Sequence, residues 1–120
     1  MKSDKNRDFA KNPRTKEESV GLILKAIKDD KLIGGCISYL GYHCALGHLL
    51  TQNQRNYLFK HNVSDSSVED IAKVVGRKNL KAMTGLNYDE LDLLVVRNDT
   101  STYSLKVYLK ELSPKSFKEC

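Results

Sequence analysis

The chain has 120 residues and a formal net charge of +5, with 40% apolar residues, 29% charged residues and two prolines. A chain of this length and composition folds as one globular domain, so two domains, a disordered chain and a fibrous chain are excluded. The three cysteines, an odd number without a C-x-x-C spacing, do not form the disulfide framework of a small secreted protein. We therefore expect a cytoplasmic protein.

The positive charge lies mainly at the N-terminal end of the sequence. Residues 1–16 carry six basic and two acidic side chains, whereas residues 17–112 carry twelve of each and are formally neutral. This distribution predicts a basic flexible arm over residues 1–14, a single globular domain over residues 15–113 and a tail over residues 114–120. Because a cationic arm can neutralise phosphates, nucleic-acid binding through residues 1–16 is one hypothesis.

One long uncharged segment raises the question of a membrane. The 23 residues 32–54 carry no formal charge and are long enough to span a bilayer. They include four glycines and two histidines, and imidazoles are costly in lipid unless they are paired within a bundle. Charges near the N-terminus also replace the apolar run of a secretory signal. We expect a buried segment of a soluble core, no signal peptide and no membrane partner.

The first half of the chain contains two predicted helices. Thr15 and Glu18 match a capping box, and the apolar residues that follow have helical spacing, which predicts a helix over residues 16–31. Residues 33–42 contain three glycines and fit a short strand or an extended loop. A short buried helix is predicted from residue 43 to residue 53, with three leucines on one face: Leu46, Leu49 and Leu50. Residues 56–59 fit either a strand or a turn of helix.

Three more helices are predicted in the second half. Ser66 and Glu69 match a second capping box, and Gly76 stands where that helix would end. Asn87 is a predicted N-cap for a helix that buries Leu91, Leu94 and Val95. The last helix starts near Thr102 and stops before Pro114, and the alternative is a strand, since the residues at 103, 105, 107 and 109 alternate. The predicted fold is mainly α, a compact bundle of about five short helices, with room for a short strand pair formed by residues 36–42 and 56–60.

Reactive side chains cluster around the predicted buried helix. Cys44 and His48 would lie one turn apart and could share a metal ion, with Cys36 and His61 as further ligands, but the spacing matches no known zinc module, so we predict no metal and no cofactor. A thiol at a helix start can also act as a nucleophile, which would make Cys44 catalytic if a histidine served as its base.

Asn98 and Asp99 stand between the last two predicted helices. Short polar side chains at such a position usually cap the next helix, so we expect them to accept hydrogen bonds from N–H groups at or just after Thr100. The alternative is that both lie beside Cys44 and line a small polar cleft.

Three short motifs together carry a resemblance. Residues 42–47 read Tyr-His-Cys-Ala-Leu-Gly, residues 84–86 read Thr-Gly-Leu, and Asn98-Asp99 precedes the last helix. Over about residues 17–112 the chain resembles small uncharacterised proteins of bacteriophages, prophages and bacteria that share a C-A-L-G or C-C-L-G box and a later N-D pair. The resemblance implies a mostly helical accessory protein, and the positions that match its motifs are Cys44, Gly47, Asn98 and Asp99.

These observations lead to three functional hypotheses. The first is a small accessory protein that binds a macromolecular partner, most simply a protein, and modulates a host process such as defence from the host cytoplasm. The second is a cysteine-dependent hydrolase or transferase that uses Cys44, and the third is nucleic-acid binding through the basic arm. The candidate binding residues are Asn98, Asp99, His43 and His48. The sequence predicts no oligomeric state.

Overall fold

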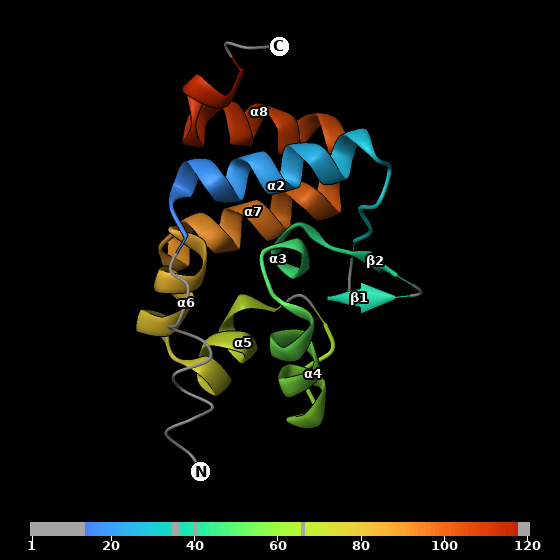
Figure 1. The fold of residues 1–120 in the computed structure, drawn as a ribbon, viewed down its shortest axis with the longest axis vertical. Helices are drawn as coiled ribbons and strands as arrows, with labels where there is room; N and C mark the ends of the chain where they lie inside the picture. Colours follow the sequence, from blue (N-terminus) through green and yellow to red (C-terminus); the bar gives the residue numbers. More distant parts are fainter. Residues whose placement is uncertain (1–13, 35–36, 40, 66, 118–120) are drawn as a thin grey trace.

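The computed structural model describes residues 14–34, 37–39, 41–65 and 67–117 (Figure 1). These residues form seven α-helices and a two-stranded hairpin. The helices are α2 (Lys16–Lys28), α3 (Ala45–His48), α4 (Gln52–Lys60), α5 (Val68–Val75), α6 (Arg77–Thr84), α7 (Tyr88–Thr100) and α8 (Thr102–Leu112). The hairpin consists of β1 (Ser38–Tyr39) and β2 (Tyr42–His43), and a 3-10 turn follows at Pro114–Phe117. The mainly α prediction is confirmed, although about five helices was too few.

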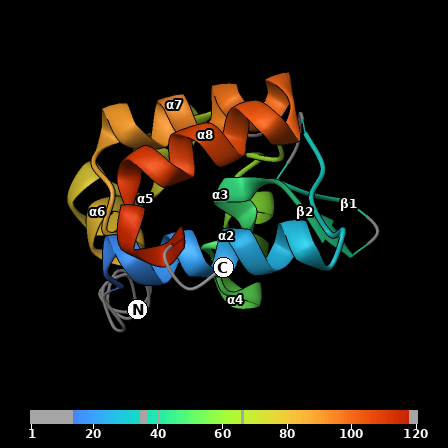
Figure 2. The ribbon, with the colours of Figure 1, turned by 90° about the horizontal axis from the view of Figure 1, so that it is seen from above.

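The helices are arranged in two groups. Figure 1 shows the three longest helices, α2, α7 and α8, in one half of the molecule and α3 to α6 in the other. Helix α7 is shared, because it pairs with α8 on one side and contacts α3, α5 and α6 on the other. Helix α3 contacts both α2 and α7, and Figure 2, seen from above, shows it where the space between those two helices projects. Fully buried side chains from both groups form one core, including Ile23, Leu46, Leu80, Leu91, Leu94, Leu105 and Leu109.

Helix α2 begins as predicted. The Thr15 hydroxyl accepts a hydrogen bond from the Glu18 N–H and the Glu18 carboxylate accepts one from the Thr15 N–H, which completes the capping box. The helix ends at Lys28, earlier than residue 31. The positive φ of Asp30, 56°, marks the turn that ends it.

The predicted helix over residues 43–53 is two helices, α3 and α4. Thr51 separates them, because its hydroxyl accepts from the Gln54 N–H while the Gln54 side chain accepts from the Thr51 N–H. This capping box starts a helix that includes residues 56–60, so the predicted strand pair between residues 36–42 and 56–60 was wrong. The pair that does form is the local hairpin of β1 and β2. Leu46, Leu49 and Leu50 are buried as predicted.

Helices α5 and α6 are joined by a single residue, Gly76. The N-cap of α5 is Ser67, one residue later than predicted, and its hydroxyl accepts from the Asp70 N–H. Gly76 ends α5 at the predicted position, with φ of 89° and ψ of 144°, a positive-φ conformation that favours glycine. Helix α6 follows directly and was not predicted.

Helix α7 starts at the predicted Asn87 capping box and continues to Thr100, past the Asn98-Asp99 pair. Ser101 caps α8, where its hydroxyl accepts from the Ser104 N–H, so the strand alternative for this segment was wrong. Over the ranges of the chain that the structure describes, no helix is both long enough and apolar enough to cross a membrane.

Candidate functional site

The four-residue helix α3 lies at the centre of the predicted reactive cluster, and side chains from distant parts of the sequence hold its N-terminal end. Cys44 is its N-cap: the Sγ atom accepts a hydrogen bond from the Gly47 N–H at 3.2 Å. The Asn98 Oδ1 atom accepts from the Ala45 N–H at 3.2 Å. Two backbone donors that a helix start leaves free are therefore satisfied by side chains.

Asn98 caps a helix, but a different one from that predicted. Its Nδ2 atom donates to the Ile33 carbonyl at 2.9 Å, so the one side chain joins α7, α3 and the segment before β1. Asp99 lies beside Gly34, where a Cβ atom would stand 2.9 Å from Asp99 Oδ1. Neither residue caps α8, because α7 extends to Thr100 and Ser101 takes that role.

The C-terminal end of α3 is held by two arginines. Arg55 is only 9% exposed and donates to the carbonyls of Gly47 at 2.8 Å and Leu50 at 2.6 Å. Arg14 donates to the Leu49 carbonyl at 2.6 Å. Cations at a helix C-terminus complement its unpaired carbonyls. We call this arrangement the α3 corner; it comprises Cys44, Gly47, Arg55, Asn98 and the two neighbouring histidines, His43 and His48.

The two histidines of the α3 corner contact each other. Their ring centroids lie 4.9 Å apart in an edge-to-face arrangement, and His48 Nε2 donates to the Lys31 carbonyl at 3.0 Å. Burial, with the charge of Arg55 nearby, lowers the pKa of His43 to about 4, and burial also lowers the pKa of His48. Both rings are therefore neutral at physiological pH.

This geometry fits a structural role for Cys44. The residue is 1% exposed and its sulfur already accepts a backbone hydrogen bond, whereas a nucleophilic thiol must reach its substrate. No group of three His, Cys, Asp or Glu side chains in the described ranges could hold a metal ion. The proposed ligand Cys36 lies outside those ranges, and His61 packs against the Tyr57 ring, with centroids 4.3 Å apart.

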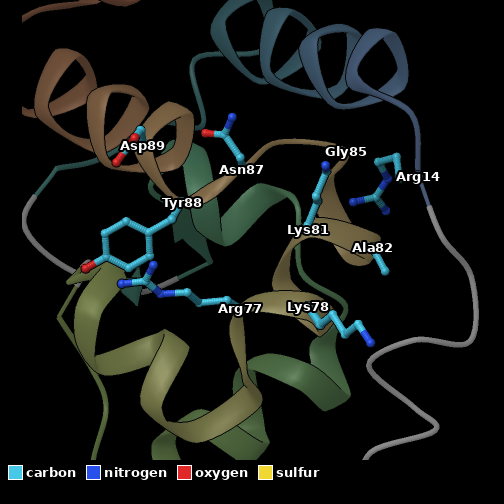
Figure 3. Close-up of a pocket in the computed structure, with 9 residues that line it drawn as sticks. All are labelled: Arg14, Arg77, Lys78, Lys81, Ala82, Gly85, Asn87, Tyr88 and Asp89. Carbon is cyan, nitrogen blue, oxygen red and sulfur yellow. The ribbon is translucent and has the colours of Figure 1, made fainter.

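A surface hollow of about 790 Å³ lies where α6, the start of α7 and the chain before α2 meet (Figure 3). We call it the basic hollow, because four of its side chains are cationic and one is anionic. Its lining consists of Arg14, Arg77, Lys78, Lys81, Ala82, Gly85, Asn87, Tyr88 and Asp89.

Three contacts fix the shape of the basic hollow. The Arg77 guanidinium lies 4.2 Å from the centroid of the Tyr88 ring, a cation–π contact that holds both side chains. Gly85, with φ of 72°, permits the chain before α2 to pass close by, since a Cβ atom at Gly85 would stand 2.5 Å from the backbone nitrogen of Lys16. The N–H of Arg14 donates to the Ala82 carbonyl at 2.9 Å. The start of the described chain is thereby attached to the wall of the hollow.

The cations that α6 contributes form no close ion pair in the described ranges, although Lys81 and Glu90 attract each other electrostatically. Within the described ranges, the ion pairs join Lys16 to Glu90, Lys25 to Asp29 and Lys73 to Glu69, and none involves the cations of α6. A second hollow, of about 490 Å³, is acidic and shares Tyr88 with the first; its carboxylates are Asp65, Glu69, Asp92 and Asp99. The formally neutral domain thus separates its charges in space.

The sequence-based candidates did not include the basic hollow. Arg77, Lys78 and Lys81 were counted within a neutral stretch, and the helix that carries them was not predicted. The available signal was three basic residues within five positions, with no acidic residue among them.

Comparison with known proteins assigns no family. No family model, no curated protein and no solved structure matches this chain. The functional argument therefore depends on the geometry of the two regions described above.

Proposed function

We propose that this protein acts by binding a macromolecular partner, and that the basic hollow is the contact surface. The observation that carries the proposal is the set of three cations on α6, without ion pairs in the described ranges, at the edge of a hollow of about 790 Å³. Several cations around one hollow attract an anionic ligand, so its binding there is electrostatically favourable.

The partner is anionic at the point of contact. Four cationic side chains and one carboxylate line the hollow, and Arg77 is held in place by the Tyr88 ring. A side chain that is already fixed loses little conformational freedom when a ligand binds, which favours affinity. We propose no reaction, since the burial of Cys44 and its hydrogen bond support a structural role for the thiol.

The resemblance to small phage, prophage and bacterial proteins supplies the setting of the proposal. In that setting the protein is an accessory product in the host cytoplasm, and binding through the basic hollow modulates a host process such as defence. Expressing the wild type and a hollow variant in a bacterial host, followed by phage challenge, tests this part. If the phage plates with the same efficiency on cells that express either protein, the hollow has no role in that process.

The binding surface itself is tested with heparin as a model polyanion. The variant Lys78→Ala/Lys81→Ala removes two cations from the hollow, and Lys106→Ala/Lys110→Ala removes two exposed cations from α8 with the same change in net charge. We expect the hollow variant to elute from immobilised heparin at clearly lower salt than the α8 variant. Elution of both variants at the same salt would show that net charge, and not the hollow, governs binding.

A further inference from the structure

The cations of the basic hollow recur along one helix. Lys81 is one helical turn from both Arg77 and Lys78, whereas the side chains of Arg77 and Lys78 point away from each other (Figure 3). Side chains spaced by one turn are neighbours on a helix surface. A ligand that meets all of them must carry negative charge at successive positions, as a polymer does when every unit is charged.

The wall of the hollow adds a flat apolar surface to these cations. Tyr88 supplies an aromatic ring, and Ala82 and Gly85 supply surface without charge (Figure 3). Aromatic rings and arginine guanidinium planes are the groups on which proteins stack unpaired nucleic-acid bases. The hollow therefore combines contacts for phosphate with contacts for a base.

The chain leads from the hollow directly into the most basic part of the sequence. Arg14 lines the hollow and is attached to its wall through the Ala82 carbonyl. The residues before it include four basic side chains, Lys2, Lys5, Arg7 and Lys11, against two acidic ones. The most basic part of the sequence therefore directly precedes a residue of the hollow.

Resting on the proposed function, we infer that the partner is a single-stranded nucleic acid. Its phosphates contact Lys78 and Lys81, and one base packs against the Arg77–Tyr88 pair, in which the guanidinium lies over the ring. An acidic protein segment satisfies the cations equally well, but it lacks a regular charge on every unit and a flat base for the aromatic wall. That partner is the alternative outcome of the test.

The test measures fluorescence anisotropy with three labelled probes: a single-stranded oligothymidylate, an abasic strand of the same length and a polyglutamate with the same number of charges. We expect the wild type to bind the oligothymidylate most tightly. Lys78→Ala/Lys81→Ala weakens that binding by about tenfold or more and lowers the salt slope by about 1.4, since each lost contact to a single strand removes about 0.7. Lys106→Ala/Lys110→Ala leaves both values near those of the wild type.

The base contact has its own control. Tyr88→Ala weakens oligothymidylate binding by about fivefold or more, as expected for the loss of one stacked base, but changes binding of the abasic strand much less. Tyr88→Phe keeps the ring and retains the wild-type affinity. If Tyr88→Ala does not fold, the preference of the wild type for the base-bearing strand provides the same information.

The outcomes separate this inference from the proposed function. Polyglutamate that binds at least as tightly as the oligothymidylate, and is lost equally in the hollow variant, overturns the nucleic-acid inference and leaves the proposed function intact. Oligothymidylate binding that is unchanged in the hollow variant also overturns the inference. If no probe binds and heparin elution does not distinguish the two lysine variants, both proposals are wrong.

Discussion

The α3 corner and the basic hollow use polar side chains in opposite ways. In the α3 corner, Cys44, Asn98 and Arg55 form hydrogen bonds to backbone groups of the same chain. In the basic hollow, the cations of α6 form no ion pair in the ranges that the structure describes. Cys44 and Asn98 therefore maintain the fold, whereas the cations for which we propose a ligand lie on a different helix, α6.

This difference makes stability and binding separable. Substitutions in the α3 corner should lower the free energy of unfolding and spare polyanion binding, and substitutions in the basic hollow should do the reverse. The five predictions below test that separation, from the largest expected change in stability to the smallest.

The largest effect is expected from Gly47→Ala. A Cβ atom at Gly47 would collide with the Ile37 carbonyl oxygen, which is backbone and cannot rotate away, so we expect a loss of about 3 kcal/mol. The control is Gly21→Ala in α2, where no atom lies within 4 Å of the new methyl group. That change should stabilise the protein by about 0.5–1 kcal/mol. Urea unfolding measures both, and a neutral Gly47→Ala variant would show that α3 has room to move.

Asn98→Ala should cost about 2 kcal/mol, because it leaves the Ala45 N–H and the Ile33 carbonyl without their partner. Asn53, exposed on α4, is the matched control, and its replacement by alanine should stay within about 0.5 kcal/mol of the wild type. Heparin elution of Asn98→Ala should equal that of the wild type. Normal stability with weakened heparin binding would show that Asn98 contributes to ligand binding and not to the stability of the fold.

Cys44→Ala should cost about 1 kcal/mol, the usual value for a lost N-cap. A second measurement follows the alkylation of Cys44 by iodoacetamide at neutral pH, with the other two cysteines replaced. Because Cys44 is 1% exposed, we expect its reaction in the folded protein to be much slower than in urea. Rapid alkylation of the folded protein would restore the hypothesis of a reactive cysteine.

Acidification should destabilise the α3 corner. The pKa of His43 is about 4 in the folded protein against 6.5 for an unperturbed imidazole, so the unfolded chain binds more protons between these values. The free energy of unfolding therefore falls as the pH drops from about 6.5 to about 4, and solvent screening of the partly exposed ring keeps the total fall below about 1 kcal/mol. His43→Gln/His48→Gln should flatten this dependence. An equal slope in the double variant would assign the effect to carboxylates instead.

Lys78→Ala/Lys81→Ala should change the free energy of unfolding by no more than about 0.5 kcal/mol, since both side chains are exposed and unpaired within the described ranges. Relief of repulsion among the cations favours a small gain in stability. Thermal unfolding provides the measurement. A large loss of stability would indicate that these lysines support the fold. Weaker heparin binding by the variant would then be explained by partial unfolding and not by the loss of a binding surface.

The parts of the fold that were predictable have strong local signals. Helices α2 and α7 each begin with a capping box and continue with apolar residues at helical spacing, so neighbouring residues alone determine their starts. Helix α6 has neither signal: Gly76 offers no side-chain cap, and the apolar stripe consists of Leu80 and Met83. Helix α4 had a readable signal at Thr51 and Gln54, which was interpreted as the end of the preceding helix.

The candidate site was harder to predict because its decisive contacts are non-local. The bond from Ala45 to Asn98 joins residues 53 positions apart, and no spacing rule connects them. A position of Asn98 and Asp99 beside Cys44 was only the alternative to their predicted role as caps of the last helix. The distribution of charge in space was also hard to predict. A count of twelve basic and twelve acidic residues over residues 17–112 does not show that some of them separate into two hollows of opposite charge.

The bonds at both ends of α3 also have a consequence for the order of folding. Four residues are too few to form a stable helix alone, because nucleation costs more than so short a helix returns. Its partners come from residues 14, 55 and 98, so α3 forms only after both ends of the domain have assembled around it. The Ala45 and Gly47 amides should therefore exchange with solvent at the rate of global unfolding, and during synthesis this segment should remain unstructured until α7 has left the ribosome.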